Sequence, residues 1–145
     1  MKPLTKAIRI AERVRERCEF VAMHTKGYEF SEDKTLYCMC GIASVALSRE
    51  LRRNGIRNKI VYGDFKKNES AWGSDHCWVG VEGHVIDITA TQFGDEFPSV
   101  MVEAADYSEH YDASMVVRNI KDFFRGWEPG QRPHKRILKK ILTVA

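Results

Sequence analysis

Three residues of this chain could together carry out acyl-transfer chemistry: Cys40, His76 and Asp87. A cysteine attacks a carbonyl as the thiolate, an imidazole takes and returns the proton, and a carboxylate holds the imidazole in the correct tautomer. Because the chain has 4 cysteines and 5 histidines, the residue types alone are weak evidence. Their expected placement, at a helix start and on one face of a hairpin, is what favours the interpretation.

Cys40 is predicted to begin an amphipathic helix that ends at Gly55. The residues of its apolar stripe are Cys40, Ser44, Leu47 and Leu51. At a helix start the sulfur atom meets unpaired backbone N–H groups and the positive end of the helix dipole, and both stabilise a thiolate. The residues that follow, 59–63, are typical of a buried strand.

The segment from residue 75 to 93 contains two strand-like runs split by Glu82-Gly83, which we predict to be a two-residue turn. In the resulting register, His76 and Asp87 are diagonal neighbours on one face of the sheet, and Cys77 projects to the other face. The directly opposed pairs of that register are His76 with Thr89, Trp78 with Asp87 and Gly80 with Val85.

The order of these motifs resembles the transglutaminase-like branch of the papain-like cysteine fold. The matching motifs, between residues 37 and 93, are C-x3-S, L-x3-L, G-I, V-x-G, H-x-W-V and G-H-V-I-D-x-T-x-x-Q. In that pattern a glycine follows the nucleophile by 15 residues, as Gly55 follows Cys40, which selects Cys40 over Cys38. The resemblance implies that His76 is the general base and Asp87 the residue that orients it.

The resemblance implies an α+β fold over residues 1–145, a single papain-like (transglutaminase-like) domain. Its nucleophile helix would pack on a small antiparallel sheet, flanked by N- and C-terminal helices. The implied reaction is that of a cysteine-dependent amide hydrolase or acyltransferase (protease, glutamine deamidase or transglutaminase type) acting on a protein or peptide amide through a thioester on Cys40, with no cofactor. A small single-domain version of this fold resembles the papain-fold effector and toxin domains of bacteria and phages. The alternative is a catalytically inactive copy that binds a partner protein through its cleft or its basic C-terminal helix.

Departures from the family pattern leave the oxyanion donors open. The C-G-S-C-W signature of papain proteases is absent, no glutamine lies shortly before Cys40, and Ile88 stands where the family usually has proline. The backbone N–H of Cys40 is the first candidate donor. Gln92 is a second candidate, or alternatively a structural residue that closes the turn at Thr91.

Two aromatic residues are further candidates for the site. Trp78 could shield the histidine and aspartate from water, although a plain core aromatic would occupy the same position. Tyr37 could face the substrate together with Tyr28 and Phe30, or these residues could pack onto the core from the predicted loop at residues 26–34.

The flanking segments are predicted to be mainly helical. Apolar residues recur at helical spacing from Leu4 to Ala22, with Val14 or Arg15 and the core cysteine Cys18 on the stripe and a solvated face of arginines and glutamates. A strand is predicted near residues 98–104 and a helix from about 114 to 127. The basic amphipathic segment 133–145 is predicted to dock onto the domain, in preference to a membrane surface or to nucleic acid bound by residues 132–140.

The composition fits one globular domain. A chain of 145 residues with 43% hydrophobic and 30% charged residues can build a real core, and a net charge of +3 is too small to indicate nucleic acid. Four cysteines without a long apolar segment favour a reducing cytoplasm and free thiols. A zinc site is disfavoured because Cys38, Cys40, His76 and Cys77 lack the usual ligand spacing. The oligomeric state is left open.

Overall fold

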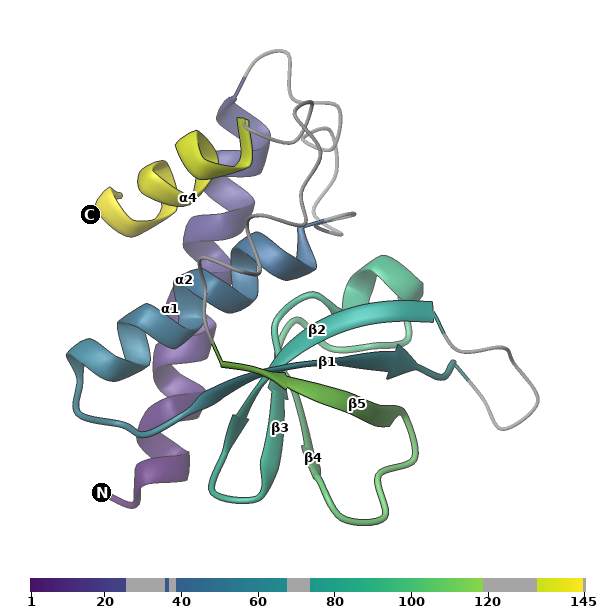
Figure 1. Ribbon diagram of the computed structural model, residues 1–145. Coiled ribbons are helices and arrows are strands. Elements are labelled where there is room, and N and C mark those ends of the chain that lie inside the picture. Colours follow the sequence, from purple (N-terminus) through teal and green to yellow (C-terminus); the bar gives the residue numbers. More distant parts are fainter. Residues whose placement is uncertain (26–35, 37–38, 68–73, 119–132, 145) are drawn as a thin grey trace.

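The computed structural model describes residues 1–25, 36, 39–67, 74–118 and 133–144. Over this part of the chain the fold is α+β, with the α-helices on one face of a five-stranded antiparallel sheet (Figure 1). The helices are α1 (Pro3–His24), α2 (Cys40–Arg53), α4 (Pro133–Thr143) and the short 3-10 helix η1 (Ala90–Phe93). The strands are β1 (Lys59–Phe65), β2 (Ser74–Val81), β3 (His84–Asp87), β4 (Met101–Ala104) and β5 (Tyr111–Val117), in the spatial order β4-β3-β2-β1-β5.

The helix layer is organised around α2, which contacts α1, α4, β1 and β2. Nearly every side of α2 is apolar and buried, as expected for a helix with neighbours all round it. Helix α4 inserts Ile137, Leu138 and Ile141 into this core, which confirms the predicted docking of the C-terminal helix. Cys18 is fully buried in the same core, as predicted. None of the helices in the described part of the chain has the length and apolar character needed to cross a membrane.

The sheet has a second, smaller core on the face turned away from the helices. Strand β2 alternates between the two sides, with Val79 and Val81 in the helix core and Trp78 in the second core. Strand β1 runs two residues past the predicted strand, residues 59–63, and ends at Phe65, of which only 1% is exposed. Phe65 stacks on Phe93 with ring centroids 4.3 Å apart, so burial of this aromatic pair extends the strand.

The hairpin between β2 and β3 has the predicted turn. Glu82 and Gly83 both have positive φ, 48° and 74°, as a two-residue type I′ turn requires. The predicted pair Gly80 with Val85 is present, but the ladder stops at Val79 with Ile86. The other two predicted pairs are therefore wrong: β2 and β3 are paired only as far as Ile86, and after Asp87 the chain turns into η1 instead of continuing alongside β2.

Beside the site, β2 is paired with β1, and His76 lies opposite Gly63. A Cβ atom at Gly63 would lie 2.1 Å from the carbonyl oxygen of Asp112 and 2.8 Å from Trp78 Cη2. Only glycine fits at this position, which gives the V-x-G motif of β1 a steric reason.

The predicted helix from residue 114 is wrong over its first turn. Residues 111–117 form the edge strand β5, paired with β1 through a register shift between Tyr62 and Gly63. Met115 and Val116 would begin the apolar stripe of such a helix, but they are 56% and 40% exposed, and pairing with β1 decides the structure here. The rest of that predicted helix, residues 119–132, and the predicted loop at 26–34 lie outside the described residues. The strand predicted near residues 98–104 is β4, which covers Met101–Ala104.

Both residues left open for the α1 stripe, Val14 and Arg15, are buried. Arg15 Nη1 donates hydrogen bonds to the carbonyl oxygen of Ile88 at 2.6 Å and to Thr91 Oγ1 at 2.9 Å. Its Nε lies 2.9 Å from Glu19 Oε1 in an ion pair on the same helix. Arg15 therefore fixes the segment that follows Asp87 to α1.

Replacing this arginine should loosen the fold. We expect Arg15→Ala to lower the free energy of unfolding by about 2–3 kcal/mol, because the buried carbonyl of Ile88 and the hydroxyl of Thr91 each lose a charged donor. Arg13→Ala, on the exposed face of the same helix, is the matched control and should change it by less than about 0.5 kcal/mol. Urea unfolding measures both, and equal losses would contradict the assigned role of Arg15.

Candidate active site

Cys40 is the first residue of α2, as predicted, and its thiol is free and partly exposed. The N-cap residue of this helix, Met39, makes no side-chain capping hydrogen bond. A cysteine in the first turn of a helix lies near unpaired backbone N–H groups and the positive end of the helix dipole, and both favour a thiolate. The sulfur also forms hydrogen bonds with the His76 ring and with Cys77, through both the side chain and the backbone of Cys77.

His76 and Asp87 form a buried pair, and each is only 1% exposed. His76 Nε2 lies 2.7 Å from Asp87 Oδ2, so the predicted diagonal contact across the hairpin is present. Because Nε2 is engaged by the carboxylate, Nδ1 is the ring nitrogen left for Cys40. Rings of the second core surround the imidazole, with Phe93 at 4.9 Å and Phe65 at 5.7 Å between centroids.

The Asp87 carboxylate accepts further hydrogen bonds from two residues that the sequence did not indicate. The backbone N–H of Thr89 donates to Oδ1 at 2.8 Å, and its hydroxyl lies 3.2 Å from the same oxygen. The Tyr111 hydroxyl donates to Oδ2 at 2.8 Å. The D-x-T spacing of an Asx turn could have revealed Thr89. Tyr111 comes from β5, where no strand was predicted, and carried no such signal.

Opposite charges dominate the protonation of this pair. Burial would raise the pKa of Asp87, but His76 and the donors on Thr89 and Tyr111 outweigh it and hold that pKa below its usual 3.8. Burial would likewise lower the pKa of His76, yet the charge of Asp87 and the hydrogen bond to Cys40 raise it to about 9. Near neutral pH the pair is therefore a carboxylate and an imidazolium.

Cys77 was expected only to point away from His76, but it contacts the nucleophile candidate. Its hydrogen bond holds the pKa of Cys40 well below the usual 9.0, against the effect of burial, and His76 lowers it further. The same contact raises the pKa of Cys77, so Cys77 keeps the proton. Because the β2–β3 ladder ends at Val79, the backbone of Cys77 has no partner in β3 and its N–H can face Cys40.

The remaining candidates divide into those near the imidazole and one outside the described residues. Trp78 is 2% exposed, its ring centroid lies 6.1 Å from that of His76, and it packs at 5.0 Å against Tyr111. Gln92 Nε2 donates to the carbonyl oxygen of Thr89 at 3.1 Å and lies 3.4 Å from His76 Nδ1. The Gln92 amide is thus beside the nitrogen that serves Cys40. Tyr37 lies outside the described residues.

A cavity of about 670 Å³ opens on the face of the sheet away from the helices, with Trp78 and Tyr111 in its wall. Cys40 and His76 do not line it, so it touches the site only through the two aromatic rings. Within the described ranges, no three His, Cys, Asp or Glu side chains are arranged to hold a metal ion.

Comparison with known proteins gives no relative: no family model, no curated protein and no solved structure matches this chain. The functional proposal therefore depends on the residues and contacts described above.

The role of Cys77 is testable through the pH dependence of Cys40 alkylation. We expect Cys77→Ala to raise the pKa of Cys40, because the thiolate loses its strongest hydrogen-bond donor, while Cys77→Ser keeps a donor and stays near wild type. The rate of iodoacetamide addition to Cys40, followed by mass spectrometry against pH, gives the midpoint for each variant. An unchanged midpoint in Cys77→Ala would show that Cys77 does not tune the sulfur.

The depressed pKa of Asp87 predicts an acid-labile contribution to stability. A carboxylate with a lowered pKa in the folded state stabilises the fold above its unfolded value of 3.8, and this contribution is lost as the pH falls through the folded value. The difference in unfolding free energy between wild type and Asp87→Asn should therefore be largest near neutral pH and shrink in acid. Urea titrations at roughly pH 2 to 7 measure it. Asp106→Asn, on the surface, is the control and should show no such trend.

Proposed function

We propose that this chain is a cysteine-dependent amide hydrolase or acyltransferase that forms a thioester on Cys40. The observation that carries the proposal is one imidazole, that of His76, which is hydrogen-bonded both to Cys40 and, through Nε2, to the buried carboxylate of Asp87. The arrangement supplies a nucleophile, a proton carrier and a group that fixes the tautomer.

The protons can be followed through the proposed reaction. In the resting site the proton is on His76, and Cys40 is a thiolate. The sulfur atom attacks the amide carbonyl, and the C–N bond breaks as His76 gives its proton to the departing nitrogen. The neutral imidazole then takes a proton from water or from an amine, which attacks the thioester and releases Cys40. Water as the acceptor gives hydrolysis or deamidation, and an amine gives acyl transfer.

The tetrahedral intermediate carries an oxyanion that needs two donors. The backbone N–H of Cys40, in the first turn of α2, is the first. Gln92 is proposed as the second, because its amide already lies beside His76 Nδ1. Its bond to the carbonyl oxygen of Thr89 holds that amide at the edge of the site.

The architecture is compatible with the resemblance to transglutaminase-like proteins. A helix that starts at the proposed nucleophile packs on an antiparallel sheet whose neighbouring strands carry the histidine and the aspartate. We therefore propose a papain-like core and a protein or peptide amide as the substrate.

The rival function, an inactive copy that binds a partner, requires an unreactive Cys40 and partner binding that survives Cys40→Ala.

Selective alkylation tests the proposal. Near pH 6, iodoacetamide should label Cys40 faster than the other cysteines, because the pKa of Cys18 is raised to about 12 by burial and that of Cys77 is raised by its bond to Cys40. His76→Ala should remove the preference, whereas the matched control His24→Ala, an exposed histidine on α1, should keep it. Peptide mass spectrometry gives the rate at each cysteine, and equal rates throughout would refute the proposal.

The same chain can report its substrate class. Incubated with a cell lysate, the wild type should carry an acyl group on Cys40, while Cys40→Ala should carry none. The mass of the modified peptide identifies the acyl donor. If Cys40 of the wild type is alkylated preferentially and Cys40→Ala still binds a partner protein, that partner is the substrate of an enzyme and not the ligand of an inactive copy.

A further inference from the structure

The face of the sheet that carries α2 continues past the start of that helix as two cross-strand rows. In the row at Cys77, Tyr62 of β1 lies directly opposite Cys77, and Met115 of β5 lies opposite Tyr62. In the next row, Asp75 of β2, Asp64 of β1 and Asp112 of β5 are opposed in the same way. We call Tyr62, Met115 and these three aspartates the acidic strip. It leads away from Cys77, the residue that Cys40 contacts.

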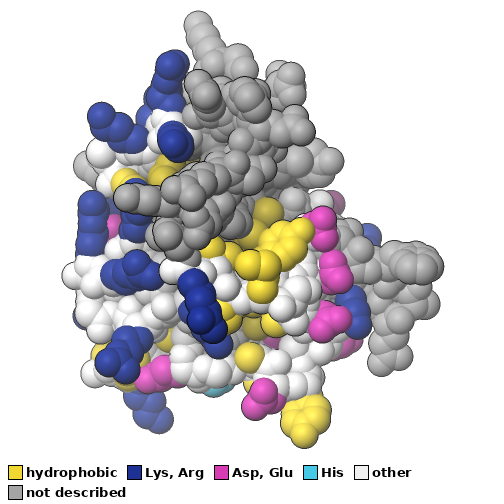
Figure 2. All heavy atoms as spheres, in the orientation of Figure 1, with side chains coloured by type: hydrophobic (Ala, Val, Ile, Leu, Met, Phe, Trp, Pro, Cys, Tyr) yellow, Lys and Arg dark blue, Asp and Glu magenta, His cyan; other side chains and the backbone are white. Residues whose placement is uncertain are grey.

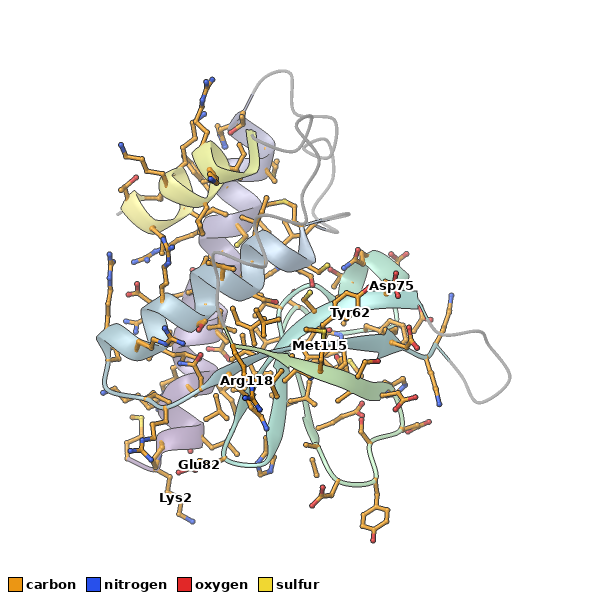
Figure 3. All side chains as sticks on the ribbon, viewed as in Figure 1. Lys2, Tyr62, Asp75, Glu82, Met115 and Arg118 are labelled. Atoms are coloured by element: carbon orange, nitrogen blue, oxygen red, sulfur yellow. The ribbon has the colours of Figure 1, made fainter. Side chains whose placement is uncertain are left out.

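The first row is an apolar platform at the surface. Met115 is 56% exposed, and Tyr62 is half-buried beside it. Asp75, Tyr62 and Met115 follow one another across the three strands (Figure 3). Since neighbouring strands are about 4.8 Å apart, Tyr62 lies roughly one strand spacing, and Met115 two, from Cys77.

The second row places like charges side by side. Directly opposed carboxylates repel, so three in succession weaken the sheet. Asp75 and Asp112 are exposed, and Asp64 is half-buried between them. Lys66 reaches Asp112 at 3.9 Å, and Asp75 accepts a hydrogen bond from the Tyr62 hydroxyl. Exposed hydrophobic side chains bordered by acidic ones are visible on this side of the molecule (Figure 2).

A bound metal ion does not explain the row. Metal ligands converge on one point within about 2.5 Å, whereas these carboxylates are spread over three strands. Within the described residues they form no candidate metal group. A row of charges next to an apolar platform instead fits a side chain that is aliphatic along its stem and cationic at its end.

We propose that the acidic strip binds a basic segment of the substrate, with a lysine or arginine side chain lying over Tyr62 and Met115 and its charge among the aspartates. This inference rests on the proposed function, since it takes Cys40 as the residue that the substrate must reach. The stem covers the exposed Met115, and the cation can also approach the ring of Tyr62. Lys66 offsets part of the repulsion within the aspartate row from the Asp112 end, and a cation bound over Tyr62 would offset more of it close to Cys77.

Charged thiol reagents test the proposal without a known substrate. Cationic trimethylammonioethyl methanethiosulfonate and anionic sulfonatoethyl methanethiosulfonate transfer different groups to the same thiolate, and each releases methanesulfinate. At low ionic strength the cationic reagent should modify Cys40 about tenfold faster than the anionic one, relative to their rates with free cysteine. The combined variant Asp64→Asn, Asp75→Asn and Asp112→Asn should abolish that preference, as should high salt.

A matched control carries the same change in net charge elsewhere. The combination Glu82→Gln, Asp106→Asn and Glu109→Gln, at exposed sites outside the strip, should keep the preference for the cationic reagent. Neutral iodoacetamide should label Cys40 at the same rate in all three proteins.

The outcomes separate the two proposals. If iodoacetamide does not prefer Cys40 in the wild type, the proposed function fails. If it does, and the cationic preference is absent or equal in the strip variant and the control, only the basic-segment inference is overturned. A faster reaction with the anionic reagent would also overturn it.

Discussion

The buried contact between His76 and Asp87 is the constraint on which the rest of the site depends. Two ionisable groups that are 99% removed from solvent are tolerated only if every remaining lone pair and proton has a partner. Thr89 and Tyr111 supply those partners from two different elements. Removing one member would leave a charge unpaired in an apolar pocket. The geometry of the pair is therefore held more tightly than that of an ion pair on the surface.

That contact also explains why the hairpin is short. If β3 continued beside β2, the backbone of residues 76–78 would be paired on both edges and Cys77 could not donate to Cys40. Because β3 ends at Asp87, the carboxylate can turn toward the imidazole and the freed edge of β2 faces the start of α2. Arg15 then fixes the departing chain to α1 through the carbonyl of Ile88. Pairing between β2 and β3 thus ends before the residues that form the site, His76, Cys77 and Asp87.

The sequence predicted the features that are local and missed those that depend on distant elements. The helix start at Cys40 follows from apolar spacing, and the contact between His76 and Asp87 follows from a two-residue turn. By contrast, Tyr111 reaches Asp87 from a strand whose apolar residues imitate a helical stripe, and Arg15 reaches the carbonyl oxygen of Ile88 from 73 residues away. The proximity of Cys77 to Cys40 could not be read from strand parity, since parity fixes the face of a sheet but not where a helix begins over it.

The resting charges of the site have a consequence for stability. His76, with its pKa raised from 6.5 to about 9, binds more protons in the folded state between those values, so it alone would make stability fall as the pH rises. Cys40, with its pKa lowered from 9.0, binds fewer protons when folded, so it alone would make stability rise as the pH approaches 9.0 from below. The two slopes oppose each other because the proton has only moved from sulfur to imidazole inside the site. A thiolate and an imidazolium kept together therefore let the folded chain hold an activated nucleophile near neutral pH without a net uptake or release of protons.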